Sequence, residues 1–151
     1  MHTRLIVKVD PATGEVLASR RSPKRGAWHD AFTEATSIAR LLPTAGFAYE
    51  VVLTDERETR CATGRGSWRR KGVETVERQL LGVHARHRVA APADLWALLP
   101  GELPTRFTVQ DLADLLKTTP HRARAVAYSL RHAGAARYVG RRARHHLYER
   151  V

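Results

Sequence analysis

The chain has 151 residues, of which 26 are lysine or arginine and 15 are aspartate or glutamate, so its formal net charge is +11 at pH 7. This balance predicts attraction to polyanions, which salt will screen. The single cysteine, Cys61, excludes an internal disulfide, and no apolar run approaches the length of a membrane span. With no apolar stretch typical of a signal peptide near its start, we expect a cytoplasmic protein without a membrane partner.

The fold class expected is α+β, beginning with a small β-β-α-β module over residues 1–62. A hairpin is predicted first, because apolar and polar residues alternate around the turn sequence Asp10-Pro-Ala-Thr-Gly14. A helix is predicted over residues 28–42, which carry an apolar face and end at a proline. A third strand is predicted over residues 47–54, and its alternation can continue to residue 61.

Residues 63–72 are predicted to be a basic linker that is rich in glycine and contains no acidic residue. Backbone N–H groups beside glycines suit a phosphate when arginines flank them, and Trp68 could stack on a base. A solvated linker with Trp68 anchoring one end is the alternative. The glycine spacing is not that of a P-loop, so nucleotide hydrolysis has no support. The linker residues expected to contact DNA are Arg65, Trp68, Arg69, Arg70 and Lys71.

The remaining residues, 73–151, are predicted to form one further domain. Residues 73–84 are expected to be a helix, and a second short helix is expected from Pro92 to Leu99. The apolar residues of the second helix are expected to close the core of this domain.

From Phe107 onward the pattern predicts a helix, a short turn, a second helix and a two-stranded hairpin. Thr108 stands at an N-cap position, and Thr119 followed by Pro120 predicts the start of the second helix. Gly134 is placed to end that helix. A strand is expected over residues 136–139, a turn over 140–144 and a returning strand over 145–151.

This stretch, and especially its TVQDLADLL helix, its L-x-x-x-G ending from Leu130 to Gly134 and its basic hairpin, resembles the winged helix-turn-helix superfamily. The resemblance covers about the last 45 residues, and the first 62 match no family of known activity. It implies that the second helix enters the major groove of double-stranded DNA and that the hairpin, the wing, touches the backbone or the minor groove. Many such regulators pair, so a homodimer is compatible with it, although no long heptad repeat is present to form a coiled coil.

We therefore expect a DNA-binding protein, either a transcriptional regulator or an accessory factor, rather than an enzyme. Arg122, Arg124 and Tyr128 on the second helix are expected to contact bases. Thr119 is expected to contact phosphate from the helix N-terminus, as are the wing residues Arg141, Arg142 and Arg144. The remaining candidates on the second helix are His121 and Arg131.

Two other classes of function stay open. Carboxylates near the predicted strands, at Asp10, Glu15, Glu50, Asp55 and Glu56, could converge on a Mg²⁺ ion in a metal-dependent nuclease or its DNA-binding subunit. The chain lacks the D…E-x-K arrangement of the common nuclease core, so we assign no catalytic residue, no metal ligand and no cofactor. An RNA-binding or protein-adaptor winged helix is the third class, because the fold alone does not decide function.

Overall fold

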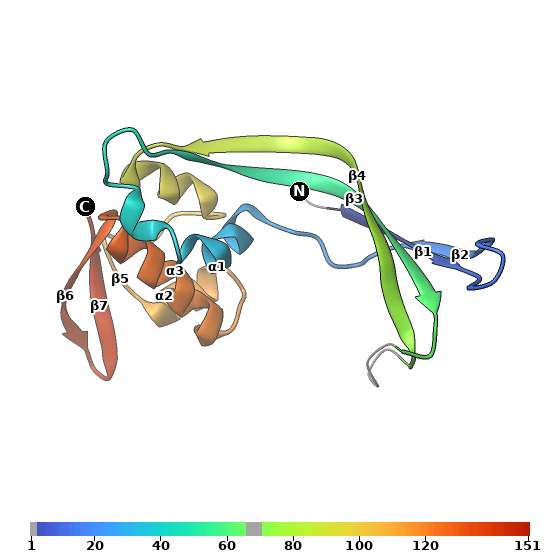
Figure 1. The fold of residues 1–151 in the computed structure, drawn as a ribbon. Coiled ribbons are helices and arrows are strands. Elements are labelled where there is room, and N and C mark those ends of the chain that lie inside the picture. The colour runs from blue at the N-terminus through green and yellow to red at the C-terminus, as the bar shows by residue number, and fades with distance from the viewer. Residues whose placement is uncertain (1–2, 66–70) are drawn as a thin grey trace. The chain divides into compact units, whose positions relative to one another are not determined.

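The computed structural model describes residues 3–65 and 71–151 and is of the α+β class (Figure 1). The chain divides into two compact units that are interleaved in sequence. Unit 1 contains residues 1–27 and 52–86, and unit 2 contains residues 28–51 and 87–151. This division differs from the consecutive modules expected from the sequence. In the part of the chain that is described, no helix is long and apolar enough to cross a membrane.

Unit 1 is built on a four-stranded sheet in the order β2-β1-β3-β4. The strands are β1 Thr3–Val9, β2 Val16–Arg21, β3 Tyr49–Ala62 and β4 Val73–Val89, of which β3 and β4 also contribute residues to unit 2. β1 pairs antiparallel with β2 and parallel with β3. The predicted hairpin is confirmed: the Asp10 carboxylate accepts the N–H groups of Ala12 and Thr13 at 2.8 and 2.9 Å, which closes the turn.

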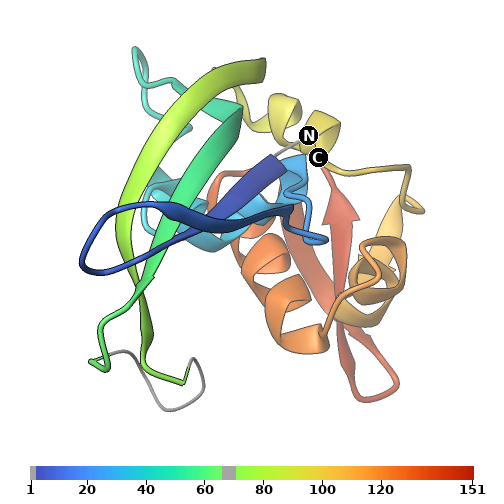
Figure 2. The same cartoon turned by 90° about the vertical axis from the view of Figure 1, so that its right-hand side faces the viewer.

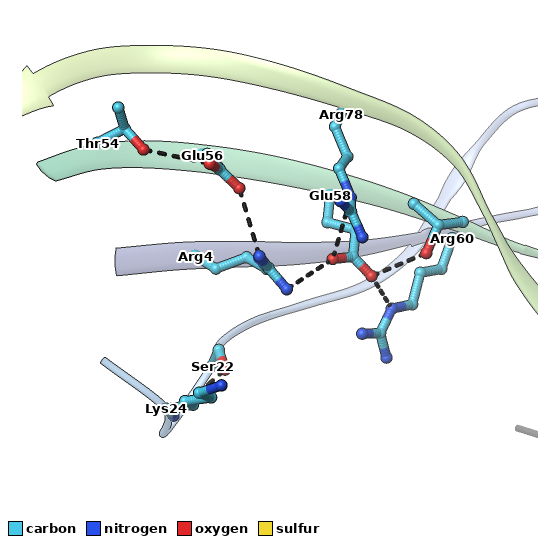
Figure 3. Close-up of polar contacts among 9 residues, drawn as sticks. Arg4, Ser22, Lys24, Thr54, Glu56, Glu58, Arg60 and Arg78 are labelled. Atoms are coloured by element: carbon cyan, nitrogen blue, oxygen red, sulfur yellow. Dashed lines mark hydrogen bonds and ion pairs between the residues drawn. The ribbon is translucent and has the colours of Figure 1, made fainter. Parts of the chain in front are cut away.

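A carboxylate buried among arginines lies on this sheet (Figure 3). Glu58 is only 1% exposed, and its Oε1 accepts hydrogen bonds from Arg60 Nε at 2.7 Å and Thr75 Oγ1 at 2.9 Å. Its Oε2 lies 3.1 Å from Arg4 Nη1 and 3.9 Å from Arg78 Nε. Burial alone raises the pKa of Glu58, but the hydrogen bonds and the arginine charges outweigh that effect and leave the pKa below its ordinary value. The cluster joins β1, β3 and β4 through a residue that must stay ionised.

We expect the substitution Glu58→Gln to lower thermal stability at pH 7 and to matter progressively less in acid. A carboxyl whose pKa is lower in the folded protein binds fewer protons there than in the unfolded chain. Its stabilising effect is therefore complete above an ordinary pKa of about 4.3 and is lost as pH falls through the folded value. Melting temperatures of both proteins from pH 7 to pH 3 measure this. Glu77→Gln, at an exposed glutamate of β4, is the control. A difference in melting temperature between Glu58→Gln and the unaltered protein that stays constant with pH would contradict a lowered pKa of Glu58.

Unit 2 packs helices against a smaller sheet. Its elements in chain order are the 3₁₀ helix η1 Trp28–Ala31, α1 Phe32–Ala35, the 3₁₀ helices η2 Ala39–Leu41 and η4 Pro92–Leu98, β5 Arg106–Thr108, α2 Val109–Leu115, α3 Pro120–His132, β6 Ala136–Arg142 and β7 His145–Arg150. The sheet order is β5-β7-β6, with antiparallel pairing throughout. Figure 2 shows α3, in orange, beside the red β6–β7 hairpin.

One apolar core holds unit 2 together and lies beneath α2, α3 and the small sheet. Phe107 on β5 is fully buried, with its ring stacked on Tyr148 of β7 at a centroid distance of 5.8 Å. The edge of a second ring, Trp96, meets it at 5.7 Å. Leu112 and Leu130 bring α2 and α3 into the same core. The prediction that Pro92–Leu99 closes this core is confirmed, although the segment is 3₁₀ rather than α-helical.

The predicted helix over residues 73–84 is wrong, because these residues lie in β4. Their apolar side chains at helical spacing do not mark a buried face: Val76 and Leu80 are 52% and 60% exposed. Pairing with β3 determines the conformation instead.

The predicted helix over residues 28–42 is present only as short pieces, η1, α1 and η2. The hydroxyls of Thr36 and Ser37 donate to the carbonyls of Thr33 and Glu34, at 3.0 and 2.9 Å. Such local bonds compete with a continuing helix. These pieces belong to unit 2, not to a sheet-covering layer of the N-terminal module.

Residues 63–72 do not link two domains but connect β3 to its sheet neighbour β4. The Gly64 N–H donates to the carbonyl of Gly72 at 3.0 Å, which closes the base of this connection. Arg65 and Lys71 are exposed. Trp68, Arg69 and Arg70 lie outside the described residues.

Candidate nucleic-acid interface

The helix α3 and the helix before it begin and end as the sequence predicts. Thr108 caps α2 and accepts the Asp111 N–H, while the Asp111 carboxylate accepts the Thr108 N–H at 2.7 Å, forming a reciprocal capping box. Thr119 caps α3 and accepts the Arg122 N–H at 3.5 Å, with Pro120 at the first helical position. Gly134, at φ +82°, ends α3, and the following N–H reaches back to the carbonyl of Leu130. These caps fix where α3 presents its side chains.

One face of α3 is open to solvent and carries most of the expected contacts. Arg124, Tyr128 and Arg131 recur at helical spacing on this face and are exposed, as is His121 beside them. Arg122 is also exposed, but two residues of helix place it roughly 160° around the axis from Arg124. Arg122 and Arg124 therefore do not share a face, although both were expected to contact bases.

The β6–β7 hairpin extends this surface. Its strands reach Arg142 and resume at His145, so the turn is only Ala143 and Arg144, shorter than the five residues expected. Gly140 is not in the turn but at an irregularity of β6, where its φ of +130° suits glycine. The turn residue Arg144 therefore lies at the tip of the β6–β7 hairpin.

A hollow of about 560 Å³ lies where α3 meets the hairpin. Arg124 contributes from α3, and Arg144, His145 and His146 contribute from the hairpin. The remaining lining residues are Val109, Gln110, Pro120 and Tyr148, so among the described residues no acidic side chain lines it. The geometry thus brings the predicted base-reading helix and the predicted wing to one cationic concavity.

Several neighbouring arginines are occupied by internal partners. Glu149 on β7 accepts from Arg106 at 2.9 Å and pairs with Arg137. Arg142, one of the expected phosphate contacts, pairs with the Asp111 carboxylate at the start of α2. Arg131 lies over the Tyr138 ring, with its guanidinium carbon 5.9 Å from the ring centroid. These side chains stabilise the surface through their contacts, and the arginines also contribute positive charge to it.

The two acidic residues of these pairs stay ionised at neutral pH. Burial alone raises the pKa of Asp111, but hydrogen bonds from Thr108 and the charge of Arg142 lower it overall. Hydrogen bonds from Arg137 and then Arg106 lower the pKa of Glu149. Each carboxylate therefore cancels part of the local positive charge.

Four arginines of this surface have neither an ion-pair partner nor an aromatic-ring contact within residues 3–65 and 71–151: Arg122, Arg124, Arg141 and Arg144. All four are exposed. An unpaired, exposed guanidinium keeps its bidentate hydrogen-bonding capacity for phosphate or for a base edge. These four residues are the ones most able to bind an external anion.

Three of the five carboxylates considered for a metal site have structural partners. Asp10 closes the β1–β2 turn, Asp55 accepts the Thr3 hydroxyl, and Glu56 pairs with Arg4 at 3.4 Å. Within the described residues, no three His, Cys, Asp or Glu side chains cluster as metal ligands would. His145 and His146 are neighbours on β7, so their side chains leave opposite faces of the strand.

A second hollow on α3 was not predicted from the sequence. His121, Arg124 and Tyr128 line it from α3, and Thr36 and Ser37 line it from the chain segment after α1. This segment lies more than 80 residues earlier in the chain, and no local sequence signal points to the contact.

A family model described as "Domain of unknown function (DUF8091)" matches residues 1–90. The matched part includes all of unit 1 and residues 28–51 and 87–90 of unit 2, whereas α2, α3 and the β6–β7 hairpin lie beyond it. No curated protein and no solved structure matches the chain.

Proposed function

Because the chain belongs to the family described as Domain of unknown function (DUF8091), we propose its function from geometry: unit 2 is a winged helix that binds double-stranded DNA. In this proposal α3 is the recognition helix and the β6–β7 hairpin is the wing. The short strand β5, which precedes the first helix of the pair, is in the same sheet as the wing because it pairs with β7.

The observation that carries the proposal is the hollow shared by Arg124 of α3 and Arg144 of the hairpin. A helix and a wing that face one concavity fit one duplex, with the helix in the major groove and the wing against the backbone. The groove is about 12 Å wide and admits an α-helix. Arginine at both positions supports contact with guanine edges and with phosphates.

The roles follow from position. Arg124 and Tyr128, on the open face of α3, are proposed to contact bases. Arg141 and Arg144 are proposed to bind phosphates. Thr119, at the N-terminus of α3, is proposed to contact a further phosphate. Arg122, on the other flank of α3, is assigned to the backbone rather than to a base. The biological role is that of a cytoplasmic transcriptional regulator or accessory DNA-binding factor.

Arg144→Ala is expected to weaken binding to all duplexes alike and to reduce the slope of log K against log salt by about 1, because one phosphate contact is lost. Fluorescence anisotropy with a labelled duplex at several salt concentrations measures the slope. Arg88→Ala removes the same charge from an exposed position of β4 that lines neither hollow, so it is the matched control. Equal slopes for these two variants would show that the wing does not touch the backbone.

Arg142→Ala is expected to change the slope less than Arg144→Ala does. Arg142 is paired with Asp111, and its removal leaves that carboxylate uncompensated near the surface. The same titrations measure it. A slope change for Arg142→Ala equal to or larger than that for Arg144→Ala would contradict the view that the ion pair holds Arg142 back from DNA.

A further inference from the structure

The chain segment from Thr36 to Leu41 borders α3 on the side away from the wing. Both α1 and η2 pack against α3 (Figure 1). Thr36 and Ser37 line the second hollow together with His121, Arg124 and Tyr128 of α3. The segment comes from the part of the chain that matches the family model. The proposed roles of α3 and the wing do not include this segment.

Arg40 is the cation of this segment. Its side chain is exposed, and it has no ion-pair partner in the described part of the chain. Burial lowers the pKa of His132, and the charges of Arg40 and Arg131 lower it further. Arg40 belongs to η2, which packs against α3, so its positive charge lies beside this helix.

The open face of α3 is thus bordered on both sides. Pro120 and Arg124 line the hollow on the wing side, whereas His121 and Ala125 line the hollow on the side of Thr36. Arg124 lines both hollows, so it lies between the two borders. The unpaired Arg144 lines the hollow on the wing side, and the unpaired Arg40 belongs to the chain segment whose Thr36 and Ser37 line the other hollow.

We propose that Arg40 binds a DNA phosphate on the backbone strand opposite the one that Arg144 contacts. The inference rests on the proposed function. A helix lying in the major groove has a phosphate backbone along each side, so a cation on each flank meets a different strand. The hydroxyls of Thr36 and Ser37 donate to backbone carbonyls. In this segment the proposed phosphate-binding group is therefore the Arg40 guanidinium. The DUF8091 part of the chain thereby completes the surface that α3 and the wing begin.

The test is the salt dependence of duplex binding by Arg40→Ala, Arg40→Lys and Arg88→Ala. Arg40→Ala is expected to reduce the slope of log K against log salt by about 0.9. When salt rises from 50 to 200 mM, the drop in affinity of this variant is then about 3.5-fold smaller than the drop in affinity of the unaltered protein. Arg40→Lys is expected to restore the slope because a lysine still neutralises a phosphate. Since Arg40 is exposed, none of these changes should disturb folding. The double variant Arg40→Ala, Arg144→Ala is expected to lose about 2 units, because the two side chains neutralise separate phosphates.

The outcomes separate this inference from the proposed function. If the unaltered protein binds no duplex, both fall. If it binds and Arg144→Ala lowers the slope but Arg40→Ala matches Arg88→Ala, the role of Arg40 alone is overturned. Tighter binding by Arg40→Ala would also overturn it, because the segment would then obstruct α3 rather than extend its surface.

Discussion

Replacing Arg124 with alanine is expected to lower the preference for a target site over unrelated duplex DNA by about 1–3 kcal/mol, or roughly 5- to 150-fold. Arg124 is exposed on the open face of α3 and lines both hollows that border this helix. Its guanidinium has no ion-pair partner in the residues described, so no internal bond must break before it contacts a base edge. The measurement is anisotropy with a site obtained by selection and with a scrambled duplex.

Arg122→Ala is the matched control for that measurement. Arg122 is on the same helix and is also exposed, but it points roughly 160° away from Arg124. Its loss is expected to weaken both duplexes by the same factor. Unchanged sequence preference for Arg124→Ala would mean that Arg124 does not read a base, and a loss of preference for Arg122→Ala would place the other flank of α3 in the groove.

Phe107→Ala is expected to destabilise unit 2 by about 3–5 kcal/mol, a large share of the stability of a small domain. The ring is fully buried and contacts Trp96 and Tyr148, so its removal leaves a cavity between β5, β7 and η4. The wing strand β7 would lose the contact that holds it to the core. Urea unfolding followed by circular dichroism measures the change in free energy.

Two further variants make the stability result specific. Phe107→Leu fills much of the cavity and should cost clearly less than Phe107→Ala. Tyr138→Ala removes an aromatic ring that is 43% exposed on β6 and should also cost less. If Phe107→Ala unfolds at nearly the same urea concentration as Tyr138→Ala, β5 and β7 are not joined through this core.

The C-terminal elements could be predicted from the sequence because their signals are local. Thr108, Thr119 and Gly134 each satisfy backbone groups within a few residues of themselves, and the structure confirms all three caps. The apolar stripe of α3 is buried as expected, from Ala123 to Leu130. Local rules also predicted the first hairpin, where Asp10 and Gly14 form the turn.

The error at residues 73–84 has a physical cause. Val73, Val76 and Leu80 have a spacing that a helix and an exposed strand can both accommodate, and only pairing with β3 decides between them. The two strands are joined by a connection of ten residues, and their pairing is a tertiary contact. The spacing of apolar residues within 73–84 contains no information about that contact.

Long-range contacts explain what was missed at the site. The pairing of Arg142 with Asp111 joins residues 31 apart, and the packing of residues 36–41 on α3 spans a still larger separation. Neither leaves a pattern in a local stretch of sequence. The sequence could nominate basic residues of α3 and the wing, but it could not say which of them are already paired or that the segment containing Arg40 packs against α3.

The central claim is that unit 2 binds duplex DNA through α3 and the wing. Fluorescence anisotropy of the full chain with labelled duplex DNA, single-stranded DNA and RNA, over a salt series with and without Mg²⁺, tests it most directly. We expect preferential duplex binding with a steep salt slope and a probe that stays intact in Mg²⁺. Weak binding at physiological salt that does not distinguish the three polymers would contradict it, and cleavage of the duplex in Mg²⁺ would point to a nuclease instead.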